Sequence, residues 1–409
     1  MKTPTFNFNV IFFSILLMSI VSSCCKPPIK DPEPNSPVKL KTCGINLYVE
    51  NSASMYGYVD AGSGFADNIS NLLADLKLSG MVSNDSTISC HYINSGAFKV
   101  NKKYQNCLND MTTDIKNPAY GRNRGTTHID KLIQDVLSQT NDSSLSILVS
   151  DMILSPGRQN DASQFMTSTR NNISSLFSNQ TGKAAILFHC VAPYRGLYYN
   201  HVDDTKSIKT SRPYYILVVG NLSLIKEFLA KQTNPKRRFT AINSVSFFSY
   251  DLVTTCRVNS VSAGYISRDK KSIQNAKLNN GKLQFSVAVD LSNIMENKAY
   301  ITEINNWSTN SSKYTITNIK EQKGLHQTHI ITVKTDSRVN KQLLKLSLKR
   351  TDMPQWVMNT TIAAENANKI FDNAYLDKTF GLQEIVEGIY DGYYYNKPDH
   401  YAELKIQIN

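Results

Sequence analysis

Oxygen-bearing side chains directly follow one apolar stretch near the start of this 409-residue chain. Residues 45–49 are rich in β-branched, aliphatic and aromatic side chains, and Glu50, Asn51, Ser52 and Ser54 come immediately after them. Carboxylate and hydroxyl oxygens are the ligands of hard divalent cations such as Mg²⁺, which takes about six of them. This stretch is therefore a candidate for part of a metal site.

Two further stretches place similar oxygens beside predicted elements. Thr126 and Thr127 precede a predicted helix, and Asp151 follows an uncharged predicted strand at 144–149. Open α/β sheets bind their ligands at the edge where parallel strands end. We therefore expect three loops to meet at one sheet edge, with the following candidate metal ligands: Glu50, Ser52, Ser54, Thr126, Thr127 and Asp151.

The elements that must position these residues alternate between strands and helices. Apolar runs predict strands at 45–49, 87–94, 144–149, 184–192 and 214–219. Helical spacing of apolar residues predicts helices at 66–78, 129–137, 162–177 and 222–231. This alternation predicts an α/β fold with a doubly wound, mainly parallel sheet.

The order of these motifs resembles the von Willebrand factor type A domain with its metal-ion-dependent adhesion site. Ser52 and Ser54 match the two serines of the family's D-x-S-x-S loop, and Glu50 stands where that loop has aspartate. Thr126 or Thr127 falls at the family's threonine, since the register is ambiguous by one residue. Asp151 matches the aspartate of T-D-G, with Met152 in place of the glycine. The resemblance covers residues 43–231.

The resemblance implies a binding module rather than an enzyme. In that family a Mg²⁺ ion, with Mn²⁺ or Ca²⁺ as alternatives, accepts a carboxylate from a partner protein at its open position. Glu50 is one methylene longer than aspartate, so it either reaches the ion directly or crowds the site and leaves a scaffold whose metal site has decayed. Both outcomes stay open at this point.

The pattern changes after about residue 236. Alternating stretches at 283–289, 299–304, 314–319, 329–334 and 343–348 predict antiparallel strands, followed by a helix at 382–390 and a strand at 402–408. We therefore expect an α/β domain over 42–235 and a β-rich accessory domain over 236–409.

The N-terminus resembles that of a bacterial lipoprotein. An apolar run at 10–21 leads to Ser22-Ser23-Cys24, which predicts a signal peptide over 1–23 and lipidation of Cys24, with Cys25 as the alternative. Residues 24–41 are rich in proline and charge, as is typical of an extended tether. We expect an outer-membrane lipoprotein, facing the periplasm or the cell surface, that is held to the membrane by its lipid.

Charge and cysteine content argue against nucleic acid binding and against a cysteine-based metal site. The formal net charge is +12, but the basic residues are scattered, and nucleic acid binding would need a basic stripe with interleaved aromatics. Five of the seven cysteines lie beyond the lipidation region without metal-finger spacing, which favours buried small hydrophobes.

The expected function is therefore metal-assisted binding of a protein partner, in adhesion or in assembly of an envelope complex. The alternative is a hydrolase of envelope polymers or phosphoesters that uses the same rim. Ser52 and Ser54 lack the glycines of a G-x-S-x-G nucleophile elbow, although His91, His128 and His189 are available as bases.

Overall fold

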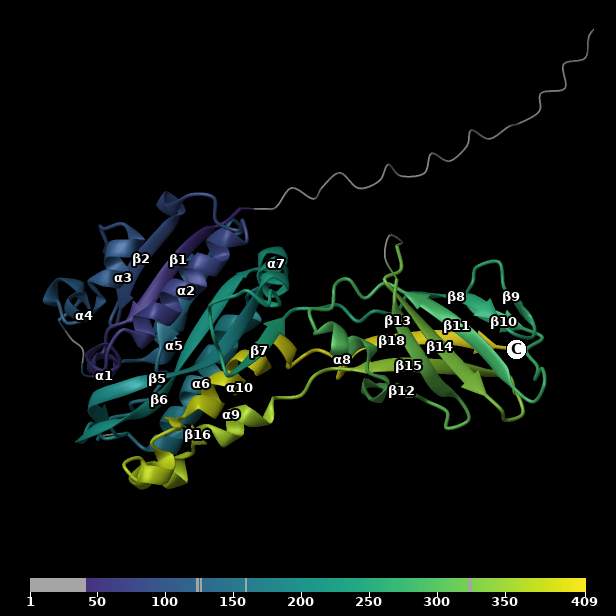
Figure 1. Ribbon diagram of the computed structural model, residues 1–409. Coiled ribbons are helices and arrows are strands. Elements are labelled where there is room, and N and C mark those ends of the chain that lie inside the picture. The colour runs from purple at the N-terminus through teal and green to yellow at the C-terminus, as the bar shows by residue number, and fades with distance from the viewer. Residues whose placement is uncertain (1–41, 123–124, 126, 159, 323–325) are drawn as a thin grey trace, which may run out of the picture. The chain divides into compact units, whose positions relative to one another are not determined.

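The computed structural model describes residues 42–409 except residues 123–124, 126, 159 and 323–325 (Figure 1). The expected signal peptide (1–23), the lipidation site Cys24 and the tether (24–41) lie outside the described residues, as does Thr126. Within the described part of the chain, no helix is both long enough and apolar enough to span a membrane.

A seven-stranded mixed sheet forms the centre of the α/β part (Figure 1). β1 pairs in parallel with β2 on one side and with β4 on the other. β4 is buried at every residue, as its uninterrupted uncharged run predicts. In spatial order the strands are β3 (Ala97–Val100), β2 (Ile88–Ile93), β1 (Gly44–Glu50), β4 (Ser144–Ser150), β6 (Thr205–Asn221), β5 (Lys183–Tyr199) and β7 (Asn243–Phe248).

The other half of the sheet is antiparallel, so the expectation of a mainly parallel sheet is wrong. β5 and β6 are 17 residues long each and pair along their whole length as one hairpin, and β6 runs antiparallel to β4. Only residues 200–204 join the two strands, which is too short for the crossover that parallel neighbours need. Apolar runs indicate buried strands but do not tell the direction in which two strands pair.

Helices cover both faces of this sheet. On β5, the ring of Phe188 contacts Phe228 of α7, whereas the next residue, His189, stacks on Trp356 of α9. Successive strand residues point to opposite faces, so α7 and α9 lie on opposite sides. The four predicted helices are confirmed to within a few residues. The helices of this part are α1 (Tyr56–Asp60), α2 (Gly64–Leu78), α3 (Tyr104–Asn109), α4 (Met111–Asp114), α5 (Ile129–Gln139), α6 (Ala162–Ser178) and α7 (Leu222–Gln232).

Two smaller sheets contain most of the strands after β7. The expectation of antiparallel β structure is confirmed apart from two short parallel pairs, β10 with β18 and β16 (Thr361–Ile362) with β17 (Thr379–Phe380). The predicted strand at 299–304 is wrong, because Asn297 caps a short helix, α8 (Lys298–Thr302), by accepting a hydrogen bond from the Ala299 amide. The strands, in spatial order, are β12 (Trp307–Thr309), β15 (Gln342–Lys349), β18 (His400–Ile408), β10 (Ser272–Gln274) and β9 (Tyr265–Ile266) in one sheet, and β13 (Thr315–Glu321), β14 (His329–Thr335), β11 (Leu283–Val289) and β8 (Cys256–Val261) in the other.

Segments from beyond residue 236 also complete the α/β part. β7 is the edge strand next to β5, and α10 packs along α6, where Arg170 forms ion pairs with Glu387 and Asp391. The α/β part therefore includes residues on both sides of the expected boundary at 235/236. The returning elements are α9 (Gln355–Asn359), β16 (Thr361–Ile362), β17 (Thr379–Phe380) and α10 (Leu382–Tyr394).

The cysteines of the described residues behave as small apolar side chains. All five are buried and present as free thiols, namely Cys43, Cys90, Cys107, Cys190 and Cys256. Burial raises the pKa of the Cys43 thiol to about 11, which keeps it protonated at neutral pH.

Candidate metal centre

The ends of β1 and β4 meet at one edge of the sheet. The two strands are parallel neighbours with Val49 opposite Val149, so Glu50 and Ser150, the last residues of the two strands, lie side by side. The Ser150 hydroxyl donates a hydrogen bond to Glu50 Oε2 at 2.5 Å. The parallel pairing of these two strands therefore places the predicted first and third loops in contact.

Five of the six predicted ligands line one small cavity at this edge. The cavity has a volume of about 20 Å³, which is room for roughly one water-sized species. Thr126, the alternative for the threonine position, lies outside the described residues. The residues around the cavity are Glu50, Ser52, Ala53, Ser54, Gly125, Thr127, Asp151, Ile153, Ser155 and Tyr199.

Two buried carboxylates face this cavity, and neither forms an ion pair within the part of the chain that the structure describes. Glu50 is 3% exposed and Asp151 is 2% exposed. Burial, and secondarily the nearby Asp151 charge, raise the pKa of Glu50 to about 7, although hydrogen bonds from Ser150, Ser52 and Thr127 oppose the shift. Burial also raises the pKa of Asp151, against a hydrogen bond from Ser54 and the charge of Arg212. The cavity is therefore a place where added positive charge stabilises both ionised carboxylates.

Hydroxyl groups supply the remaining oxygens. Ser52 Oγ and Ser54 Oγ lie 2.9 Å apart. The buried Thr127 Oγ1 has no hydrogen bond of good geometry within the described part of the chain, yet it lies close enough to Glu50 to favour the ionised carboxylate. A buried oxygen without a full partner is costly, and a cation or a water in the cavity would satisfy it.

This donor set fits a hard cation. Among the residues that the structure describes, no three His, Cys, Asp or Glu side chains are grouped to hold a metal. Two carboxylates and three hydroxyls would therefore act together, with water completing the coordination, which is the oxygen chemistry that Mg²⁺ takes.

No protein-family model and no curated protein sequence matches this chain.

A buried amide network that the sequence does not reveal fixes the first loop. Asn51 is fully buried; its Nδ2 donates to the Tyr120 carbonyl at 2.9 Å, and its Oδ1 accepts from Asn94 Nδ2 at 2.7 Å. Gly121 has φ +102°, and a Cβ there would lie 2.4 Å from Asn94 Nδ2, so this turn needs glycine. The network ties residues 51–54 to two neighbouring loops.

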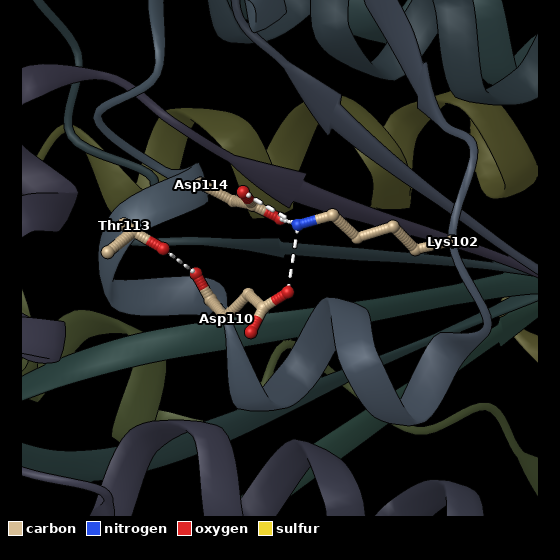
Figure 2. Close-up of polar contacts among 4 residues, drawn as sticks. All are labelled: Lys102, Asp110, Thr113 and Asp114. Carbon is tan, nitrogen blue, oxygen red and sulfur yellow. Dashed lines mark hydrogen bonds and ion pairs between the residues drawn. The ribbon is translucent and has the colours of Figure 1, made fainter.

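An ion-pair cluster holds the segment that leads into that turn. Figure 2 shows Lys102 Nζ between Asp110 and Asp114, at 2.8 Å from an oxygen of each. The Asp114 side chain is only 7% exposed, and the Thr113 hydroxyl donates to the Asp110 carbonyl at 2.8 Å. These carboxylates are already paired, so they form a structural support rather than a second metal site.

Arg212 is a further buried charge near the site, and nothing in its sequence neighbourhood indicates it. The residue is 1% exposed, and its guanidinium lies 3.7 Å from the centre of the Tyr198 ring. It donates to the backbone carbonyls of Leu376 at 2.6 Å and Lys378 at 3.3 Å. Its positive charge favours ionised Asp151, and its hydrogen bonds hold residues 376–378 against β6.

Met152 takes the backbone conformation that glycine favours. Its φ is +50°, its side chain is fully buried, and its amide donates to Ser150 Oγ at 2.8 Å. Left-handed backbone at a non-glycine residue costs about 1 kcal/mol or more and marks a constrained turn. The turn after Asp151 is therefore held by packing despite the absence of glycine.

None of the three histidines considered as catalytic bases lines the cavity. His91 stacks on Tyr48 at 4.8 Å between ring centres, and His128 contacts Phe165 at 6.1 Å. His189 lies between Tyr215 and Trp356 at 5.5 and 5.4 Å. These contacts give the histidines packing roles, and no serine–histidine pair stands at the rim among the described residues.

Proposed function

We propose that the α/β part of this chain binds a divalent cation, preferentially Mg²⁺ with Mn²⁺ or Ca²⁺ as alternatives, and uses it to hold a protein partner. One observation carries the proposal. The side chains of Glu50, Ser52, Ser54, Thr127 and Asp151, from three loops, line a single cavity large enough for one small species.

Each residue has a separate role in this proposal. Glu50 and Asp151 supply the negative charge, and the cost of burying both ionised carboxylates is offset by the cation. Ser52, Ser54 and Thr127 supply neutral oxygens. Ser150 holds the Glu50 carboxylate in position through its 2.5 Å hydrogen bond.

The bound cation would supply Lewis-acid attraction for a carboxylate of the partner at a position otherwise occupied by exchangeable water. Ser155 and Tyr199 also line the cavity, beside the residues of the three loops. A rim site of this kind suits recognition of an exposed acidic side chain.

We also propose that the chain is an envelope lipoprotein, lipidated at Cys24 and spaced from the membrane by residues 24–41. Adhesion and assembly of an envelope complex are both consistent with a tethered binding module. Mass spectrometry of the mature N-terminus tests this part, since an unmodified Cys24 at an uncleaved N-terminus would remove the anchoring proposal.

Isothermal titration of Mg²⁺, Mn²⁺ and Ca²⁺ into the full chain tests the metal proposal. We expect one site per chain, lost in Asp151→Ala and retained in Asp336→Ala, whose carboxylate is exposed. Absence of binding of all three cations to the wild type would overturn the proposal and leave the α/β fold unaffected.

A further inference from the structure

The β5–β6 hairpin extends well beyond the rest of its sheet. β4 pairs only with residues 215–220 of β6, and β7 pairs only with residues 184–189 of β5. We call residues 190–199 and 205–214 the distal hairpin. Among the described strands they pair only with each other, and Figure 1 shows this end of the hairpin reaching α1. A two-stranded ribbon is weak alone, so it needs support from the body of the protein.

The distal hairpin is clamped to the first loop of the candidate metal centre. The Tyr194 hydroxyl lies 3.1 Å from the Ser54 carbonyl and 2.5 Å from the Leu197 carbonyl, so its one proton is shared between the first loop and β5. Its ring also packs so closely on Gly57 that a Cβ at that position would lie 2.2 Å from it. Tyr199, at the end of β5, lines the cavity itself. The distal hairpin is therefore a fixed wall of the rim.

Two cations stand side by side on the exposed part of this wall. Arg195 and Lys209 are both exposed and lie directly opposite each other across the two strands. Like charges in this arrangement destabilise a strand pair. The nearby Asp60 carboxylate is paired with Lys116 at 2.6 Å and offers Arg195 only its backbone carbonyl. The positive charge of the pair is thus left available to a partner.

Apolar surface lies beside these cations. Leu197 is 50% exposed and Val191 is 43% exposed. Both lie an even number of residues from Arg195 along β5, so all three side chains are on the same face of the strand. The distance along the strand from Arg195 to Tyr199 is about 13 Å, at about 3.3 Å per residue. The rim therefore presents the metal centre, an apolar side chain and two cations in sequence.

We propose that the distal hairpin is a second contact surface of the partner-binding site and accepts an extended acidic segment of a partner protein. This inference rests on the proposed function. One carboxylate of the segment would lie at the cation, an apolar side chain would cover Leu197, and a second carboxylate four residues along would pair with Arg195 and Lys209. Charge complementarity and the spacing along β5 favour this partner over an uncharged one.

A short fluorescein-labelled peptide tests the inference, with two aspartates flanking a serine-leucine-serine core. Its binding to the full chain is measured by fluorescence polarisation in the presence of Mg²⁺. We expect the double variant Arg195→Glu, Lys209→Glu to bind roughly tenfold more weakly, with the difference shrinking at high salt. The control is Lys320→Glu, Lys341→Glu, which changes the net charge equally at two exposed lysines, one in β13 and one just before β15, and is expected to bind as the wild type does.

The outcomes separate this inference from the proposed function. Wild-type affinity in the hairpin variant, or no peptide binding by a wild type that binds Mg²⁺, overturns the hairpin proposal alone. If the hairpin variant aggregates while its peptide affinity is unchanged, the two cations protect the strand edges instead. Absence of binding of all three cations in the titration overturns the proposed function, and the hairpin inference with it.

Discussion

The hydroxyl of Ser150 lies 2.5 Å from Oε2 of Glu50, so the final residues of two neighbouring parallel strands are joined by a hydrogen bond. This contact fixes the direction of a carboxylate that is buried and close to Asp151, and that has no ion pair among the described residues.

The stability of the metal-free protein should fall as the pH rises through neutrality. The pKa of Glu50 is raised from 4.5 to about 7 on folding, so its contribution is full below pH 4.5 and is lost as the pH rises through about 7. The shift corresponds to about 3 kcal/mol. Urea unfolding in chelator between pH 4.5 and 8 measures it, as the difference between the wild type and Glu50→Gln. A difference that does not change with pH would show that the folded Glu50 has an ordinary pKa.

Binding of Mg²⁺ should release protons at neutral pH. Because the pKa of Glu50 is about 7, roughly half of the carboxyl groups carry a proton at that pH and must lose it to act as a ligand. Titration calorimetry in buffers of different ionisation enthalpy gives the number released, which we expect to be about 0.5 per site at pH 7 and close to zero at pH 9. Tight binding without proton release at pH 7 would mean that Glu50 is not a ligand.

Arg212→Met should destabilise the protein strongly. The change leaves the carbonyls of Leu376 and Lys378 without their donor and removes the positive charge that favours ionised Asp151. We expect a loss of about 3 kcal/mol in the free energy of unfolding, measured in urea. The exposed Arg268→Met is the control and should change it by less than about 0.5 kcal/mol. Equal stabilities of the two variants would contradict a structural role for the buried guanidinium.

Asp114→Asn should lower the free energy of unfolding by about 1 kcal/mol, because it weakens the cluster that holds the segment leading into the turn at Gly121. Lys102 keeps Asp110 as a partner in this variant. The protein therefore loses one charge-assisted contact, the one between Lys102 and the Asp114 side chain, which is 7% exposed. The matched variant Asp110→Asn, at a side chain that is 47% exposed, should cost less because water screens the pair. Thermal unfolding of both variants makes the comparison, and the reverse order would show that Asp110 carries the cluster.

Much of the candidate site can be predicted from the sequence, because its residues directly follow strands whose ends are visible as a change from apolar to polar residues. The apolar runs before Glu50 and Asp151 indicate where β1 and β4 stop, and the helix starting at Ile129 indicates the threonine loop. The carboxyl ends of neighbouring parallel strands lie at the same edge of a sheet. The side chains therefore converge once the strand ends are known and β1 pairs in parallel with β4. Asn51, Arg212 and Tyr199 carry no comparable signal, since their roles arise from contacts with residues far along the chain.

The sequence by itself determined the positions of the helices, the buried strands and the polar residues that follow them, because side-chain period and turn residues act over a few neighbouring positions. Only the tertiary structure decided that β5 and β6 form one long antiparallel hairpin, that residues 355–394 pack against the α/β part, and that burial raises the pKa of Glu50 to about 7. Pairing direction depends on which strand edges meet, and the pKa depends on how much water the surrounding chain excludes. Both are properties of the whole fold.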